Sequence, residues 1–147
     1  MKRLIETQDD VAAMVARLAL GAVMFPHGAQ KVLGWFGGYG LSGTYHWFTG
    51  QMGIPGLFAA LAIAAEFLGS LGLIAGALAR LAAFGIASNM LVAIVMVHVH
   101  NGFFMNWFGN QKGEGFEYHI LALALAAIVM IRGGGRWSVD RALQMPA

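Results

Sequence analysis

Residues 98–119 read HVHNGFFMNWFGNQKGEGFEYH and separate two long apolar segments of the chain. They contain three of the five histidines, two of the seven acidic residues and six aromatic side chains. Polar side chains are costly within a membrane, so a membrane protein that gathers them in one place is expected to bind or transform something there. We interpret this stretch as the mouth of a site and the apolar segments beside it as its scaffold.

The chain as a whole is too apolar for an ordinary soluble domain. Of its 147 residues, 59% are hydrophobic and 11% are charged, and the mean hydropathy is +0.67. A helix needs about 20 apolar residues to cross a hydrocarbon core about 30 Å thick, so this length allows about four crossings and no second domain. We predict an all-α fold, a four-transmembrane-helix up-down bundle that occupies residues 1–147 as one domain in a lipid bilayer.

Two features of the composition exclude whole classes of function. The chain has no cysteine, which removes disulfides, thiolate metal sites and a thiol-based quinone reductase. The net charge of +2 comes from scattered lysines and arginines rather than from a basic run, so nucleic acid is not expected as a partner.

Four apolar segments are long enough to be the membrane spans. They are expected at about residues 11–34, 56–78, 80–104 and 116–131. The connector at residues 35–55 contains no Lys, Arg, Asp or Glu but six large aromatic side chains, among them Trp35. We expect this connector to lie in the membrane interface, either as an aromatic belt or as a re-entrant flap over the bundle.

The distribution of lysine and arginine predicts the orientation of the bundle. One side of the four-span arrangement carries Lys2, Arg3, Arg80, Arg132, Arg136 and Arg141. Only Lys31 and Lys112 approach the other side. By the positive-inside rule both termini are cytoplasmic and the two aromatic-rich loops are outer. The outer half of the bundle then holds all five histidines, His27, His46, His98, His100 and His119.

The first span carries a row of polar side chains. Arg17, Met24 and Lys31 recur every seven residues, and His27 lies one turn before Lys31. These side chains therefore share one helix face, which is expected to look into the bundle. A snorkelling anchor and a functional group are the two interpretations of Lys31, and its neighbour His27 favours the second. Arg17 is instead interpreted as an anchor at the inner interface.

Glu66 stands near the middle of the second span. An isolated ionised carboxylate at that depth costs about 2.5–3.5 kcal/mol or more, so a partner or a bound proton is expected. Arg17 and Asn89 are the polar residues nearest in depth. A structural ion pair and a proton-carrying carboxyl group are both open interpretations.

Two histidines compete for the inner face of the third span. At about 100° per residue, His100 shares a face with Asn89, whereas His98 points elsewhere. Glu117 begins the last span, where it either complements the helix dipole or faces a ligand beside the histidines.

Several motifs together resemble the DoxX family of small four-helix membrane proteins. They are H-G-x-x-K at residues 27–31, Glu66, H-x-x-N-G-F-F at residues 98–104, Glu117 and G-G-x-x-S-x-D at residues 134–140. The resemblance covers nearly the whole chain, implies a multi-pass protein of the bacterial cytoplasmic (inner) membrane, and points to His98 rather than His100. The family name comes from the membrane subunit of a thiosulfate:quinone oxidoreductase, and relatives are linked with quinone or thiol redox stress.

A quinone-linked oxidoreductase, or its membrane subunit, is the function that we expect. Quinone is the expected cofactor, and it needs an aromatic slot, hydrogen-bond donors at its carbonyls and a proton path. Catalytic roles are predicted for His27, Lys31, Glu66, His98 and Glu117. Contacts to the cofactor are predicted from His27, His98, His100, His119, Trp35 and Trp107. No electron store is evident in the chain, so a redox partner is expected to deliver electrons.

Two alternatives stay open. In the first, two of the histidines His27, His98, His100 and His119 ligate a haem, or three of them with Glu117 hold a metal ion. In the second, the chain is a non-catalytic subunit or assembly partner of a redox complex, which docks a protein through its outer aromatic surface or associates with further copies of itself. The quinone hypothesis assigns no metal ligand.

Overall fold

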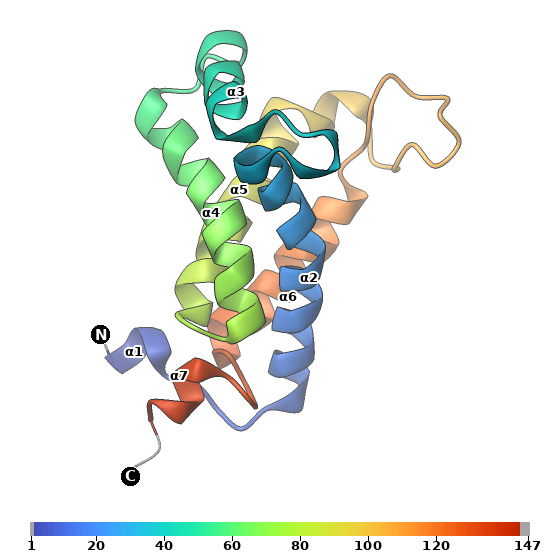
Figure 1. The fold of residues 1–147 in the computed structure, drawn as a ribbon. Helices are drawn as coiled ribbons and strands as arrows, with labels where there is room; N and C mark the ends of the chain where they lie inside the picture. Colours follow the sequence, from blue (N-terminus) through green and yellow to red (C-terminus); the bar gives the residue numbers. More distant parts are fainter. Residues whose placement is uncertain (1, 145–147) are drawn as a thin grey trace.

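The computed structural model describes residues 2–144, and every helix and turn in that range is shown in Figure 1. The ends of the predicted domain, residue 1 and residues 145–147, lie outside the described residues. The elements are α1 (Lys2–Ile5), α2 (Val11–Leu33), η1 (Trp35–Gly37), α3 (Gly40–His46), η2 (Trp47–Gln51), α4 (Gly56–Ala75), α5 (Ala79–Met96), η3 (His98–Asn101), α6 (Glu117–Arg132) and α7 (Val139–Ala142). Between residues 2 and 144 the regular structure is all helical, as predicted.

Three helices are long and apolar enough to cross a membrane, namely α2, α4 and α5. The fourth long helix, α6, has 16 residues. Helix α2 packs against α4 and α6, and α5 packs against the same two helices from the other side. The short helices α1 and α7 lie at one end of the molecule, the terminal end, while α3 and the loop of residues 102–116 lie at the opposite, loop end (Figure 1).

Local sequence signals define the ends of α2. The Asp10 carboxylate accepts hydrogen bonds from the backbone N–H groups of Ala12 (2.8 Å) and Ala13 (3.2 Å), so Asp10 caps the helix. The helix stops at Gly34, whose φ of 71° lies in the left-handed region that favours glycine. The predicted first span is therefore confirmed closely.

Glycines in α2 allow it to approach α4 at backbone contact distance. A Cβ atom at Gly28 would lie 2.7 Å from the Cα atom of Phe67 and 2.9 Å from the carbonyl oxygen of Glu66. A Cβ atom at Gly21 would lie 3.0–3.1 Å from Ile74 and Leu73. Because van der Waals packing holds membrane helices together, this close approach fixes the height of α2 relative to α4.

Arg17 holds the terminal end together from within. Its side chain is 2% exposed, and its N–H groups donate five hydrogen bonds to backbone carbonyls at distances of 2.7–3.3 Å. The acceptors are Leu73, Ile74, Gly134, Arg136 and Trp137. The interpretation of Arg17 as a snorkelling anchor was wrong, because the last turn of α4 and the chain after α6 surround the guanidinium and supply all its acceptors.

The closing motif at residues 134–140 also has a structural role. The carboxylate of Asp140 accepts hydrogen bonds from the backbone N–H groups of Leu78 (2.8 Å) and Ala79 (2.9 Å), at the start of α5. The Ser138 hydroxyl donates to the carbonyl of Gly135 (2.8 Å). This motif therefore caps α5 and closes the loop that holds Arg17.

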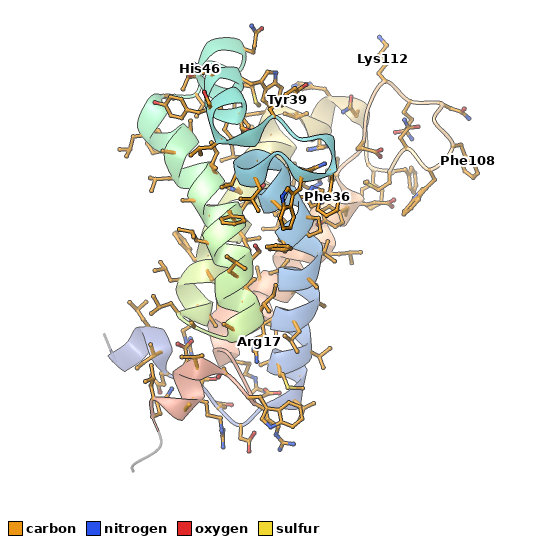
Figure 2. All side chains as sticks on the ribbon, viewed as in Figure 1. Arg17, Phe36, Tyr39, His46, Phe108 and Lys112 are labelled. Carbon is orange, nitrogen blue, oxygen red and sulfur yellow. The ribbon has the colours of Figure 1, made fainter. Side chains whose placement is uncertain are left out.

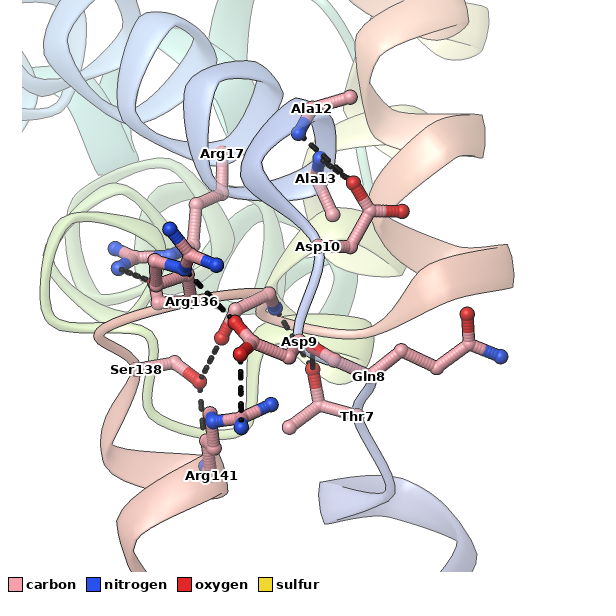
Figure 3. A network of polar contacts seen from close by, with 11 residues as sticks. Thr7, Gln8, Asp9, Asp10, Ala12, Ala13, Arg17, Arg136, Ser138 and Arg141 are labelled. Atoms are coloured by element: carbon pink, nitrogen blue, oxygen red, sulfur yellow. Dashed lines mark hydrogen bonds and ion pairs between the residues drawn. The ribbon is translucent and has the colours of Figure 1, made fainter.

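The segments before α2 and after α6 bind each other directly (Figure 3). Gly135 donates its backbone N–H to the Thr7 hydroxyl at 2.7 Å. The Asp9 carboxylate pairs with Arg136 at 2.9 Å and with Arg141 at 3.1 Å. The hydrogen bond from Arg136 holds the pKa of Asp9 below its ordinary value of 3.8. The two termini therefore belong to the same end of the molecule.

The third predicted span is shorter than expected. Helix α5 ends at Met96 rather than near Phe104, and η3 follows it. Beyond α5 the returning chain pairs with the loop, because the backbone N–H groups of Phe116 and Glu117 donate to the carbonyls of residues 102 and 103 (3.3 and 2.9 Å). These bonds join the two ends of the loop of residues 102–116.

Candidate functional site

Glu66 forms its ion pair with Lys31 rather than with Arg17 or Asn89. The Nζ atom of Lys31 lies 2.5 Å from Oε2 of Glu66, while Asn89 donates to the carbonyl of Ala62 at 2.7 Å. Side chains tilt toward the N-terminus of their own helix. Since α2 and α4 run in opposite directions (Figure 1), the Lys31 and Glu66 side chains tilt toward each other. The sequence prediction compared only how deep each polar residue lies along its span, so it did not take this tilt into account.

The Lys31–Glu66 pair is withdrawn from solvent but incompletely bonded. The two side chains are 24% and 10% exposed. The ammonium group approaches Oε2 closely but not along a hydrogen-bonding direction, so Oε2 is buried without a hydrogen-bond partner among the described residues. A carboxylate oxygen in this state keeps the capacity to accept a further donor.

His98 and His119 form a contact pair between η3 and α6. Their ring centroids lie 4.1 Å apart. Nδ1 of His98 lies 2.8 Å from the carbonyl oxygen of Glu114, and because a carbonyl only accepts, this nitrogen carries a proton. His119 is 6% exposed, and its Nδ1 is buried without a hydrogen-bond partner within residues 2–144. The pair therefore offers an unused polar atom in a buried place.

Tyr118 links the histidine pair to α2. Its ring centroid lies 6.4 Å from that of His27 and 5.5 Å from that of His119. The Tyr118 hydroxyl donates to the sulfur of Met24 at 3.4 Å, a weak acceptor. His27 lies one turn before Lys31 on α2, so the two side chains share a helix face. The sequence prediction missed Tyr118, although a tyrosine in the first turn of an apolar helix, beside a histidine, is a usable signal.

These residues form one assembly, which we call the polar cluster: His27, Lys31, Glu66, His98, Tyr118 and His119. It joins α2, α4, η3 and α6 near the loop end. The choice of His98, which the family resemblance favoured over helical phase, agrees with this arrangement. His100 lies exposed on η3 and His46 lies exposed on α3 (Figure 2), so the five histidines do not all converge.

Glu117 does not face the polar cluster. Its Oε1 atom accepts hydrogen bonds from the backbone N–H of Met105 (2.9 Å) and from Nε1 of Trp107 (3.2 Å). The carboxylate thus braces the loop of residues 102–116 against α6. The interpretation of Glu117 as a ligand-facing group therefore has no support in this geometry, because its oxygen is committed to the loop.

The two tryptophans predicted to contact a cofactor lie apart from the polar cluster. Trp107 is 78% exposed on the loop of residues 102–116. Trp35 packs edge-on against Phe25, with ring centroids 6.4 Å apart, and is also exposed. Trp35 belongs to the aromatic connector, whose large side chains Phe36 and Tyr39 are exposed at the loop end (Figure 2), as an interface position requires.

The fold and the polar cluster together define a helical, multi-pass membrane protein with an embedded ionisable site. Residues 12–99 match the family model described as DoxX, which is more than half of the chain, and the chain belongs to the DoxX family. The matched range contains His27, Lys31, Glu66 and His98, but it ends before Tyr118 and His119.

A relative extends the similarity over nearly the full length. The chain is 29% identical over 135 residues to the inner membrane protein YqjF of Escherichia coli (strain K12), an alignment that covers 92% of this chain and 94% of YqjF. No solved structure matches the chain. The family, this relative and the three apolar spans make the chain a multi-pass protein of the inner membrane.

Proposed function

We propose that the chain is a quinone-linked oxidoreductase, or the membrane subunit of one, and that its polar cluster binds the quinone headgroup and exchanges protons with it. The observation that carries this proposal is the pair of His98 and His119, in contact at 4.1 Å, with Nδ1 of His119 buried and unpartnered in the described chain. Buried polar atoms are nearly always satisfied, so an orphan in a membrane protein points to a missing ligand or water.

The polar cluster fits the needs of a quinone headgroup. Quinone carbonyls accept hydrogen bonds, and Tyr118 has only the weak acceptor Met24 for its hydroxyl, so this hydroxyl is available as a donor. The side chain of His27 is exposed, and its ring centroid lies 6.4 Å from that of Tyr118. Lys31 supplies a positive charge that favours the anionic forms of a reduced headgroup. Two hydrogen-bonding side chains, His27 and Tyr118, and the cation Lys31 thus support the proposal.

Proton exchange is the chemistry that the chain itself would contribute. A bound quinone supplies the redox couple, which takes up two electrons and two protons on reduction to the quinol. Of the four ring nitrogens of the pair, only Nδ1 of His98 has a carbonyl partner among the described residues. The other three, which include Nδ1 of His119 and Nε2 of His98, can hold or release a proton. Glu66 can hold a proton at Oε2. With no cysteine in the sequence, a redox partner must deliver the electrons.

The proposal includes a topology of four transmembrane helices, α2, α4, α5 and α6, with both termini in the cytoplasm. The hydrogen bonds between Thr7 and Gly135 and between Asp9 and Arg136 support it, because they tie the two termini together. Helices α2, α4 and α5 make three crossings, so termini on the same side require α6 to be a fourth. Its 16 residues span about 24 Å, somewhat less than the hydrocarbon core.

The haem or metal alternative has weaker support. Ring centroids 4.1 Å apart leave no room for a metal ion between His98 and His119. Within residues 2–144 no three His, Cys, Asp or Glu side chains are grouped to hold a metal ion. The non-catalytic alternative is favoured by one feature, the exposed aromatic side chains Phe108 and Trp107 on the loop (Figure 2), which suit a docking protein of a redox complex.

Binding of a tail-less quinone to the purified protein tests the proposed function. With 2,3-dimethoxy-5-methyl-1,4-benzoquinone and full-length protein in nanodiscs, we expect saturable quenching of tryptophan fluorescence. His119→Ala and His98→Ala should each raise the Kd at least tenfold, about 1.4 kcal/mol. His46→Ala and His100→Ala are matched controls and should stay within twofold. Equal effects in all four variants, or no saturable binding to the wild type, would contradict the proposal.

A second readout separates a role in redox chemistry from a role in folding. A site that exchanges protons with quinone binds its oxidised and reduced forms with different strength, so the midpoint potential of bound quinone should differ from that of free quinone. His119→Ala should remove this difference. A merely structural role for His119 would lower thermal stability and leave the potential unchanged.

A further inference from the structure

A groove beside the polar cluster has no part in the function proposed so far. It has a volume of about 380 Å³ and lies between the loop of residues 102–116 and the first turns of α6. Its lining consists of Phe103, Met105, Trp107, Glu117, Tyr118, Ile120 and Leu121. This volume falls within the range of roughly 300–1,000 Å³ that is usual for sites of small molecules.

The chemistry of the lining selects a hydrocarbon occupant. Six of the seven lining residues are apolar or aromatic side chains without a charge. The one charged group, Glu117, accepts hydrogen bonds from Met105 and Trp107 through Oε1. These bonds hold the loop over the groove. A polar molecule would exchange its hydration for a lining with a single carboxylate, whereas a hydrocarbon chain matches the other six residues.

The groove opens on the side of α6 that faces away from the other helices. Leu121 is 66% exposed and Ile120 is 44% exposed, although both are large and apolar. In the proposed four-span topology this face of α6 contacts lipid. The groove is therefore accessible from the bilayer, and its occupant can enter laterally without crossing water.

Tyr118 belongs both to the groove and to the polar cluster. Its side chain lines the groove, while its ring lies beside His27 and His119 and its hydroxyl reaches Met24. The apolar groove and the ionisable site thus meet at a single residue. This continuity suits a molecule with a polar head and a hydrocarbon chain.

We infer that the groove binds the hydrocarbon chain of a membrane amphiphile whose polar head lies at the polar cluster, and that this amphiphile is a quinone with a long tail. The inference rests on the proposed function for the identity of the head. A phospholipid acyl chain has the same chemistry as a quinone tail, so the two sources must be distinguished by experiment.

Chain-length preference tests the groove separately from the headgroup site. We compare the Kd of the tail-less quinone with that of its decyl form, which carries the same headgroup, for full-length protein in nanodiscs. The wild type should bind the decyl form at least tenfold more tightly. Leu121→Trp, which fills the groove, should abolish this preference and change the Kd of the tail-less form less than twofold. Ile128→Trp, two turns further along α6, is the matched control and should keep the preference.

A second experiment on the groove uses a photoactivatable phosphatidylcholine with a diazirine on its acyl chain. If the tail-less quinone fails to bind, the proposed function fails, but the groove is still tested by this lipid. Labelling should then concentrate on residues 103–121, disappear in Leu121→Trp and persist in Ile128→Trp, which would identify lipid as the occupant. A tenfold chain preference that survives Leu121→Trp, or lipid labelling spread evenly along the exposed helices, would overturn the inference.

Discussion

Arg17 shows how a charge is accommodated inside this membrane protein. A guanidinium has five N–H donors and no acceptor, and all five donors of Arg17 are bonded to backbone carbonyls. Two of those carbonyls, of Leu73 and Ile74, belong to the last turn of α4, where helix carbonyls need partners from outside the regular helix. The N–H of the capping residue Gly76 also bonds to the Leu73 carbonyl. The arginine therefore satisfies a helix end and the chain after α6 at the same time.

Replacement of Arg17 is expected to be severe even when the charge is kept. Lysine has three donors at a single point and cannot reach carbonyls on two segments. Arg17→Lys should lower the free energy of unfolding by roughly 3 kcal/mol or more, because several buried carbonyls lose their donors. Thermal unfolding of the detergent-purified protein measures this loss. Arg132→Lys, at a side chain 52% exposed, is the control and should change little, so a similar loss in both variants would refute the role of Arg17.

The Lys31–Glu66 pair should respond unequally to loss of either partner. Lys31→Met leaves the Glu66 carboxylate, which is 10% exposed, without a counter-charge and should cost about 2–3 kcal/mol of stability. Glu66→Leu leaves the more exposed ammonium and should cost less. The double variant Lys31→Met with Glu66→Leu should recover most of the loss. Thermal unfolding of the four proteins completes the cycle, and a double variant less stable than either single one would show that the pair is not the interaction being measured.

At the scale of elements, the sequence pattern located the long helices, three of which are long and apolar enough to cross a membrane, but it did not predict where α5 ends. The capped, apolar pattern of α2 was readable from Asp10 to Gly34. Helical phase, in contrast, favoured His100 because it assumed that α5 continues. Val97 leaves the helical region at φ −127° and ψ −57°, and this turn brings His98 to His119. The other half of this contact depends on the return of the chain at Phe116, where α6 begins, which no local pattern contains.

The partner of Glu66 could not be derived from the sequence for a different reason. Depth along a span ignores the direction in which side chains tilt, and it ranked Arg17 and Asn89 ahead of Lys31. The close approach of α2 to α4 was easier to anticipate, because small residues at helix interfaces are a known requirement for packing in membranes. Gly28 is where this requirement is strictest.

Gly28→Ala should therefore disturb both packing and the polar cluster. Its Cβ atom would meet backbone atoms of Phe67 and Glu66 at 2.7–2.9 Å, which cannot move without a shift of α4. We expect a loss of roughly 1–3 kcal/mol, as for overpacked cores, measured by thermal unfolding, and weaker quinone binding because Lys31 and Glu66 separate. Gly50→Ala has open space around its Cβ atom and should behave as wild type; a harmless Gly28→Ala would show that the helices are not packed this closely.

At the scale of the whole molecule, the two ends have different tasks. The terminal end is saturated with hydrogen bonds, since Arg17, Ser138 and Asp140 are buried and bonded. The loop end holds Nδ1 of His119, which is buried without a hydrogen-bond partner within residues 2–144, and Oε2 of Glu66, whose partner there is the ammonium group of Lys31. Stability is therefore concentrated at one end and binding capacity at the other, and the orientation of the chain decides which compartment supplies partners and protons.

The absence of cysteine makes that orientation directly measurable, because any introduced cysteine is the only thiol in the chain. Single substitutions at exposed positions mark the loop end (Lys112→Cys), the terminal end (Ala142→Cys) and the outer face of α4 (Leu68→Cys). In intact cells with a permeabilised outer membrane, a membrane-impermeant maleimide should label Lys112→Cys only. Disruption of the inner membrane should add Ala142→Cys, whereas Leu68→Cys should stay unlabelled because lipid covers it. Labelling of Ala142→Cys in intact cells would contradict the proposed topology, in which both termini are cytoplasmic. The bonds from Arg136 and Arg141 to Asp9 require both termini on one side.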